Sequence, residues 1–252
     1  MNENKFSGMG SIYSKYRPSY PAEFIDYLKN DAGLSEDKII ADVGSGTGIL
    51  TKQLIMENNT VYAVEPNDDM RAVAECDLSS YKNFISVNGT AENTTLSNSC
   101  VDFITVAQAF HWFDGAKFKE ECRRILKPGG KVVLVWNSRD GKSSLVVEND
   151  EINRKYCPNF KGFSGAMRGA ENESDFDHFF NGNYEIRVFK NNLKFDEQGF
   201  IGRNLSASYA PKETDGNYSS YVSELKALFD RYAENGVVTM SNLTRSYVGS
   251  VV

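Results

Sequence analysis

The chain has 252 residues, 40% hydrophobic and 25% charged, which is ordinary for one globular domain or one domain with an insertion. Its net charge of −6 and its pI of about 5.1, without any block of Lys or Arg, argue against binding to nucleic acid or to an anionic membrane. The first 21 residues lack an apolar core, and no apolar run approaches the roughly 20 residues that a membrane helix needs. We therefore expect a cytoplasmic protein.

Cysteine and histidine are sparse and scattered. None of the four cysteines forms a C-x-x-C pair or has a histidine at metal-ligand spacing, and the chain has only two histidines. We expect reduced thiols and no metal site. The residues concerned are Cys76, Cys100, Cys122, Cys157, His111 and His178.

Strand-like and helix-like segments alternate over residues 39–136. Short apolar runs predict strands at 38–44, 60–66, 84–90, 100–110 and 131–137. Helical periodicity or capping predicts helices at 49–56, 67–75 and 116–130, the last closed by Pro-Gly-Gly. Strands separated by helices favour a parallel sheet with right-handed crossovers.

The pattern changes after Asn137. Residues 138–183 are polar and Gly-rich but contain recurring aromatics, which is typical of a cap with short helices. Strand-like segments at 184–195 and 237–252 flank an amphipathic helix at 218–236. The predicted fold is a doubly wound, mostly parallel, seven-stranded α/β sheet of Rossmann-like type, with an antiparallel last strand and a partly helical cap. The chain is predicted to divide into an N-terminal segment (1–30), a core (31–137), a cap (138–183) and a C-terminal segment that completes the sheet (184–252).

The loop in "ADVGSGTGIL", residues 41–50, indicates a nucleotide or nucleoside site. It lacks the Lys-Ser/Thr of a P-loop, and Ile49 stands where the dinucleotide pattern G-x-G-x-x-G needs its third glycine. Asp42 would repel a pyrophosphate, which favours a nucleoside without phosphate. Glu65, at the end of the next strand, is placed to accept the hydroxyls of a ribose, although that position alone does not separate S-adenosylmethionine from NAD.

Four motifs in order carry a family resemblance: "ADVGSGTG", "VYAVEPNDDM", "NGTAENTTLSNSCVDFITVAQAFHWFD" and "RRILKPGGKVVLVWN". Together they resemble the class I S-adenosylmethionine-dependent methyltransferases of the small-molecule "type 11" branch, over about residues 10–137. The leading "YSKYRPSYP" is similar to a subgroup that includes trans-aconitate-type methyltransferases. The resemblance implies S-adenosylmethionine as cofactor and S-adenosylhomocysteine as product.

The resemblance also implies a role for individual residues. The glycine loop would contact the methionine and ribose, Asp42 would hold that loop or the cofactor's ammonium, and Glu65 would take the ribose hydroxyls. Thr90 departs from the acid of the family's Asp-Ala pair, so Glu92 or backbone could contact the adenine amine. The full cofactor set is Tyr13, Arg17, Asp42, Gly44, Ser45, Gly46, Gly48, Glu65, Pro66, Met70, Thr90, Ala91, Glu92, Ala107 and Gln108.

The sequence says less about the residues that would bind the methyl acceptor. Methyl transfer from a sulfonium needs alignment and, for some acceptors, a base. His111 is the candidate base, with a pocket wall as the other interpretation, while Trp112 and Phe113 either shield the sulfonium or simply pack. His178 is expected to be a partly buried cap residue. Tyr20, Tyr156 and Arg139 could reach the substrate, but the expected interpretation is that each is structural or solvated.

The segment after the fourth strand bears on the class of acceptor. It contains neither Asn/Asp-Pro-Pro-Tyr nor Pro-Cys, which argues against methylation of DNA adenine or cytosine. We therefore expect a small-molecule acceptor and a monomer or homodimer. The alternatives are an NAD(P)-dependent oxidoreductase and a module that binds S-adenosylmethionine without catalysis.

Overall fold

The computed structural model describes residues 18–163 and 173–251. The chain divides into two compact units. The first, here the core unit, comprises Met1–Trp136, Gly169–Phe189 and Thr244–Val252. The second unit comprises Asn137–Arg168 and Lys190–Leu243.

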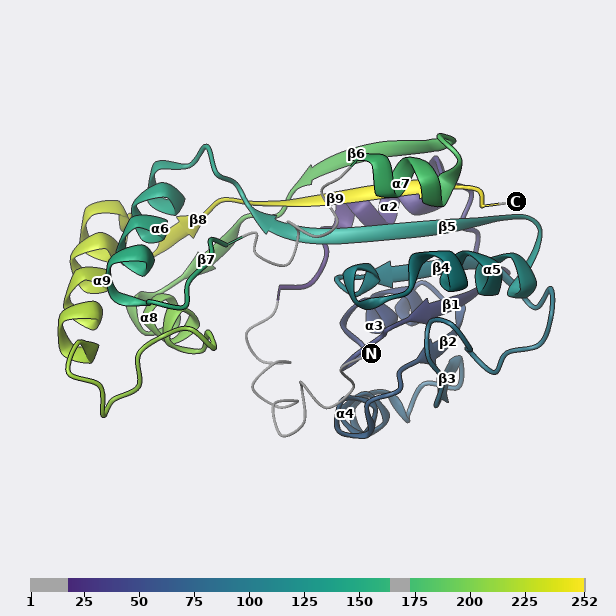
Figure 1. The fold of residues 1–252 in the computed structure, drawn as a ribbon, viewed down its shortest axis with the longest axis horizontal. Coiled ribbons are helices and arrows are strands. Elements are labelled where there is room, and N and C mark those ends of the chain that lie inside the picture. The colour runs from purple at the N-terminus through teal and green to yellow at the C-terminus, as the bar shows by residue number, and fades with distance from the viewer. Residues whose placement is uncertain (1–17, 164–172, 252) are drawn as a thin grey trace. The chain divides into compact units, whose positions relative to one another are not determined.

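The core unit is built on a seven-stranded sheet with the order β3-β2-β1-β4-β5-β9-β6 (Figure 1). Neighbours among the first five strands pair in parallel, while β9 runs opposite to β5 and β6 in Figure 1. This confirms the predicted doubly wound fold with an antiparallel last strand. The strands are β1 (Ile39–Val43), β2 (Thr60–Val64), β3 (Phe84–Val87), β4 (Val101–Ala107), β5 (Leu126–Arg139), β6 (Tyr184–Lys190) and β9 (Asn242–Gly249).

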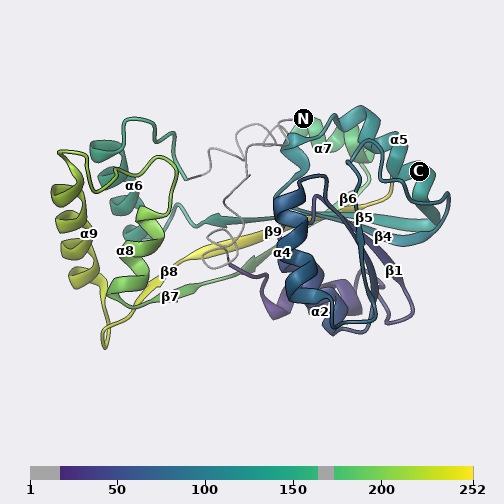
Figure 2. The same cartoon turned by 90° about the horizontal axis from the view of Figure 1, so that it is seen from below.

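Helices cover both faces of this sheet, as Figure 2 shows for α2 on one face and for α5 and α7 on the other. An aliphatic cluster joins α2 and α3 to the sheet through buried residues such as Leu28, Leu54 and Val133. On the opposite face the rings of Phe118 and Phe179 stack with centroids 5.6 Å apart. The helices of the core unit are α2 (Ala22–Asn30), α3 (Ile49–Met56), α4 (Asp68–Leu78), η2 (Phe110–Trp112), α5 (Gly115–Ile125) and α7 (Glu173–Phe180).

The second unit has its own hydrophobic core, which includes the fully buried Phe200, Tyr221 and Leu225. Two short strands pair antiparallel within it. Its elements are α6 (Ser144–Tyr156), β7 (Leu193–Phe195), α8 (Glu197–Leu205), α9 (Tyr218–Tyr232) and β8 (Val238–Met240). The sequence-based division assigned 138–183 to the cap and 184–252 to the sheet, whereas the second unit takes α8 and α9 from the later segment.

Three predicted elements have different bounds in the structure. The helix predicted over 116–130 ends at Ile125, because β5 begins at once with Leu126. Val101 pairs with Leu126 but Phe103 pairs with Lys131, so the Pro-Gly-Gly segment forms an irregularity in β5 instead of a helix end. The single strands predicted at 184–195 and 237–252 are each split in two, at 191–192 and at 241.

Of the helices described, none is both long and apolar enough to cross a bilayer. Residues 18–163 and 173–251 contain no group of three or more His, Cys, Asp or Glu side chains that could hold a metal ion.

Candidate functional site

The glycine loop connects β1 to α3 and forms one wall of the candidate site. The backbone N–H groups of Gly44 and Ser45 donate to the carbonyl of Val64 at the end of β2, at 2.8 and 3.2 Å. Gly44 has φ +69°, and a Cβ there would lie 2.7 Å from the Cβ of Ala109. The loop therefore approaches the segment after β4 as closely as a glycine permits.

Gly46 lies at the open part of this loop. It has φ +56°, which disfavours any side chain, but a Cβ built on it would meet none of the described residues within 4 Å. The backbone here is exposed to a space that a ligand could occupy. Gly48 follows as the left-handed N-cap residue of α3.

Two hydroxyls beside Gly46 lack partners in the part of the chain that the structure describes. Ser45 Oγ and Thr47 Oγ1 are buried and make no hydrogen bond there. Buried hydroxyls without a partner are rare in native proteins and indicate an absent water or ligand. With the open backbone of Gly46, they form a cradle that fits the hydroxyls and amino-acid groups of a nucleoside cofactor.

Glu65 joins this loop to the start of α4. Its Oε2 accepts from the N–H of Gly46 and its Oε1 from the N–H of Asn67, each at 2.9 Å. The side chain is buried, and burial raises the pKa of its carboxyl despite those two donors. Each carboxylate oxygen retains a lone pair, so Glu65 can accept ribose hydroxyls without losing either backbone contact.

Asp42 lies away from the ligand, which one of its two predicted roles would have it contact. Its side chain is fully buried, and it accepts hydrogen bonds from Thr51 Oγ1 at 2.6 Å and Thr105 Oγ1 at 2.7 Å. Burial raises the pKa of this carboxyl, while the two hydroxyls act in the opposite sense. Asp42 thus links β1 to α3 and β4, which supports its role in holding the loop and not contact with the cofactor's ammonium. It also removes the repulsion argument against a pyrophosphate, because the carboxyl does not face the loop's open side.

The residues predicted to line the adenine follow β2 and β3. Met70 is buried in the first turn of α4, where its N–H donates to the N-cap side chain of Asn67 at 3.0 Å. Thr90 Oγ1 accepts from the N–H of Asn93 at 3.2 Å, and Ala91 is buried. Glu92 Oε1 accepts from the N–H of Asp114 at 2.9 Å, so its carboxylate ties this loop to α5.

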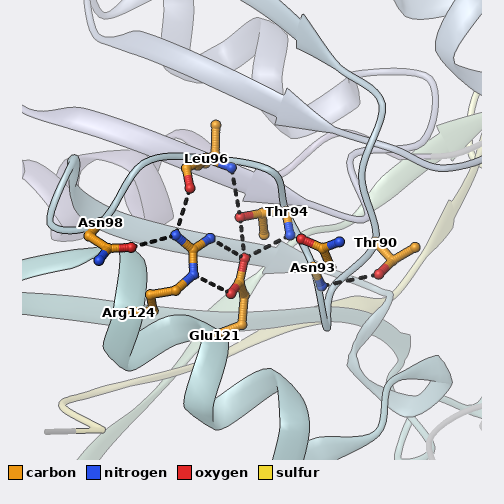
Figure 3. Close-up of polar contacts among 7 residues, drawn as sticks. All are labelled: Thr90, Asn93, Thr94, Leu96, Asn98, Glu121 and Arg124. Carbon is orange, nitrogen blue, oxygen red and sulfur yellow. Dashed lines mark hydrogen bonds and ion pairs between the residues drawn. The ribbon is translucent and has the colours of Figure 1, made fainter.

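A polar cluster absent from our sequence-based prediction fixes the same loop (Figure 3). Glu121 on α5 accepts from both the N–H and the hydroxyl of Thr94, at 2.7 and 2.5 Å. Arg124 binds both oxygens of Glu121 and also donates to the carbonyl of Leu96 at 2.7 Å. The (i, i+3) spacing of an acid and a base on a helix gave a weak signal for this pair, but the loop partners are far away in sequence.

The segment after β4 forms the opposite wall. Gln108 adopts φ +60°, a conformation uncommon outside glycine, while its N–H pairs with the carbonyl of Val135 at 2.9 Å. Phe110 is buried between α5 and α7, with its ring 4.9 Å from that of Phe179. These contacts fix η2, which carries His111 and Trp112.

A cavity of about 370 Å³ lies next to η2 within the core unit. Its wall includes His111 and Phe113, and Lys119 contributes a cation that donates to the carbonyl of His178. Its volume falls in the range of small-molecule sites. His178 is exposed on α7, so its prediction as a partly buried cap residue is wrong. The lining residues are Phe110, His111, Phe113, Gly115, Ala116, Lys119, Asp175, His178 and Phe179.

The predicted cofactor residues that the structure describes lie at or after the ends of β1, β2, β3 and β4 within the core unit. Phe113 connects the two walls, because its ring lies 3.2 Å from where a Cβ of Gly44 would stand. Trp112 is 39% exposed, so it is not part of the packed interior. Tyr13 and Arg17 lie outside the described residues.

The family of this core follows from comparison with known proteins. Residues 41–134 match the Methyltransf_11 family model, described as a methyltransferase domain. By this match, residues 41–134 form a methyltransferase domain. The domain spans the glycine loop, Glu65 and η2, which are the elements of the site described above.

The curated relatives of this methyltransferase domain carry the same general name. An uncharacterized methyltransferase of Mycobacterium tuberculosis is 40% identical over 147 residues, which are 58% of this chain and 58% of that protein. An uncharacterized methyltransferase-like protein of Schizosaccharomyces pombe is 32% identical over 161 residues, or 61% of this chain and 60% of that one. The matches thus span about three fifths of these relatives.

Solved structures share the fold of the methyltransferase domain. A provisionally named type II methyltransferase of Anaeromyxobacter dehalogenans aligns over 94% of this chain and 99% of its own, with a TM-score of 0.64 and 19% identity. The phosphoethanolamine N-methyltransferase 2 of Haemonchus contortus, solved with S-adenosylhomocysteine, aligns over 98% of this chain and 58% of its own, with a TM-score of 0.54 and 16% identity.

Proposed function

We propose that this chain is an enzyme that transfers the methyl group of S-adenosylmethionine to a small-molecule acceptor. The observation that carries the proposal is the cradle at the glycine loop, where Ser45 Oγ and Thr47 Oγ1 are buried without a partner among the described residues, beside the open backbone of Gly46. The family of residues 41–134 supports the same conclusion.

The chain's own residues would divide the work of binding. Glu65 accepts the ribose hydroxyls, and the glycine loop and its two hydroxyls contact the ribose and methionine part. Pro66, Met70 and residues 90–92 line the base, while Tyr13 and Arg17 close over the cofactor. When bound, S-adenosylmethionine supplies a methyl group on a positively charged sulfur, which a nucleophile displaces in line.

The acceptor would bind in the cavity beside η2. Three phenylalanines give that cavity an apolar wall, and four polar side chains also line it, a combination that suits a small organic molecule. We propose that His111 takes the proton from an acceptor whose nucleophilic atom must lose one. A carboxylate acceptor would need no such base.

We further propose that the protein acts in the cytoplasm, as a monomer or homodimer, and without nucleic acid as substrate. All four cysteines are free, which is typical of a reducing compartment. The net charge of −6 supports a small-molecule acceptor over a polyanion.

Calorimetric titration with S-adenosylmethionine and S-adenosylhomocysteine, with NAD as the comparison, tests the proposal. We expect both sulfur nucleosides to bind and NAD to fail at millimolar concentration. Binding of NAD alone would assign an oxidoreductase. Binding of S-adenosylmethionine without radiolabelled methyl transfer to any compound in pooled metabolites would assign a non-catalytic module.

A further inference from the structure

Arg139, the last residue of β5, lies in the second unit in an unusual setting. Its guanidinium carbon is 3.6 Å from the centroid of the Phe163 ring. Its Nη1 donates to Oδ1 of Asn149 on α6 at 2.5 Å. The residue as a whole keeps part of its surface exposed, although its guanidinium is crowded enough for burial to lower its pKa.

Arg139 forms no ion pair with an acid among residues 18–163 and 173–251, whereas Arg154, Lys155, Lys226 and Arg231 of the second unit each form one. Arg154, for example, pairs with Asp150, and Arg231 pairs with Glu148 at 2.6 Å. Burial, and then the charge of Arg203, lowers the pKa of Arg139 to about 10, so the group stays charged at neutral pH. A cation in this setting without a counter-ion is costly for the fold.

The surroundings add hydrogen-bond donors without matching acceptors. Asn149 is fully buried, and its Nδ2, which belongs to the same amide as the oxygen that binds Arg139, has no partner in the described structure. One helical turn later, Asn153 Nδ2 is buried without a partner as well. Tyr209 is close enough to Arg139 and Arg203 for both charges to act on its hydroxyl. Such an excess of donors and positive charge matches an anion.

We propose that Arg139, together with the amide of Asn149, binds the carboxylate or phosphate group of a small organic molecule. The guanidinium lies over the ring of Phe163, and its N–H edge can form paired hydrogen bonds with two oxygens of one anionic group. Asn149 orients that edge through the bond to Nη1 and adds its own N–H donors beside it. The second unit is then a ligand-binding unit and not only a cover.

This site is independent of methyl transfer. Every residue proposed to contact the cofactor belongs to the core unit, while Arg139, Asn149 and Phe163 belong to the second. Binding of an anion can therefore be measured with no cofactor present, and its success or failure does not depend on that of the proposed function.

The test measures binding of two probes to the full chain, by calorimetry and by thermal unfolding at constant ionic strength. Inorganic phosphate represents a phosphate group and benzoate represents an aromatic carboxylate. We expect saturable binding of at least one, with a Kd in the range of about 1 mM. The probe that binds more tightly identifies the anionic group. Failure of both to bind at about 50 mM would overturn the proposal.

Three variants assign the binding to Arg139. R139Q should weaken the preferred probe at least about tenfold. R231Q removes an exposed arginine from the same unit and should bind normally. N149D replaces the amide beside Arg139 by a carboxylate of the same shape, so the fold should be kept. That carboxylate should compete with the probe and weaken its binding about tenfold. If Arg139 is merely structural, R139Q should change the melting temperature but not the affinity for the probe. If R139Q does not fold, unchanged affinity in N149D would still overturn the proposal.

Discussion

Oε2 of Glu65 accepts a hydrogen bond from the backbone N–H of Gly46 at 2.9 Å. One carboxylate therefore joins the end of β2 to the most open point of the glycine loop. The contact orients the loop before any ligand binds, and it places a buried acceptor at the edge of the cradle formed by the hydroxyls of Ser45 and Thr47. Loss of that acceptor should first lower the affinity for the cofactor.

Glu65→Gln should weaken binding of S-adenosylhomocysteine by about 10- to 100-fold, or about 1.4–2.7 kcal/mol, because an amide cannot accept on both sides. Calorimetry at pH 7.5 measures this. Glu57→Gln, which changes an acid outside the loop that pairs with Lys29, is the matched control and should bind normally. An unchanged Kd in Glu65→Gln would exclude the ribose role.

The same carboxyl predicts how binding depends on pH. Its pKa is raised above the ordinary 4.5 in the folded protein, so its contribution to folding stability decreases as the pH rises through the raised pKa. Binding has the opposite sign, because the ionised form is the better acceptor. Affinity should fall as the pH is lowered through a midpoint above 4.5, and Glu65→Gln should remove that dependence.

Asp42→Asn should leave the affinity for S-adenosylhomocysteine within about threefold, because Asp42 contacts Thr51 and Thr105 inside the sheet. Asp42→Ala should lower the free energy of unfolding by about 2–4 kcal/mol, since both threonine hydroxyls lose their acceptor. Urea denaturation and calorimetry separate the two effects. A tenfold loss of affinity in Asp42→Asn would show instead that this residue acts on the ligand.

Gly46→Ala should mainly lower the affinity for cofactor, whereas Gly44→Ala should mainly lower stability. Both place a side chain at positive φ, which costs about 1–2 kcal/mol. At Gly46 the new methyl group has open space, so the chain should fold and lose affinity for cofactor. At Gly44 it would meet Ala109 at 2.7 Å, so stability should fall further. The reverse order of stability would contradict this description of the loop.

Glu121→Gln should lower the free energy of unfolding by about 1–3 kcal/mol at pH 7. Burial opposes ionisation of Glu121, but Arg124 and Thr94 outweigh it and hold the pKa of its carboxyl below the usual 4.5. The stabilisation is therefore present above pH 4.5 and lost as the pH falls through the lowered pKa. Denaturant titrations of both proteins from pH 7 to 3 should converge, and a constant difference would reject the ionic role.

His111→Asn should lower kcat by about 100-fold with little change in KM, provided the acceptor must lose a proton. The low-pH arm of the pH–rate profile, where a general base must lose its proton before it can act, should disappear as well. The assay needs the acceptor, which the pooled-metabolite experiment supplies. A change in KM alone would make His111 part of the wall of the cavity.

The positions of the core strands along the chain could be predicted from the sequence because each strand of a covered parallel sheet is a short apolar run. The motif at residues 41–50 also placed the glycine loop correctly, since alternating glycines leave few conformations other than a tight turn between strand and helix. The bounds of β5 could not be predicted, because Pro-Gly-Gly usually ends a helix and here lies in an irregularity opposite Asp102.

By itself the sequence determined the fold class, the loop and the carboxylate at Glu65, because these depend on local pattern and on residue types at short spacing. Only the tertiary structure decided that the buried Asp42 binds two threonine hydroxyls, that Glu121 and Arg124 fix the loop of Thr94, and that Arg139 pairs with no acid among the described residues. The partners of Asp42, Thr51 and Thr105, are 9 and 63 residues away in the sequence. Asn149 is 10 residues from Arg139, and Thr94 is 27 residues from Glu121. Burial and charge pairing depend on which segments the fold brings together, and no local pattern encodes that.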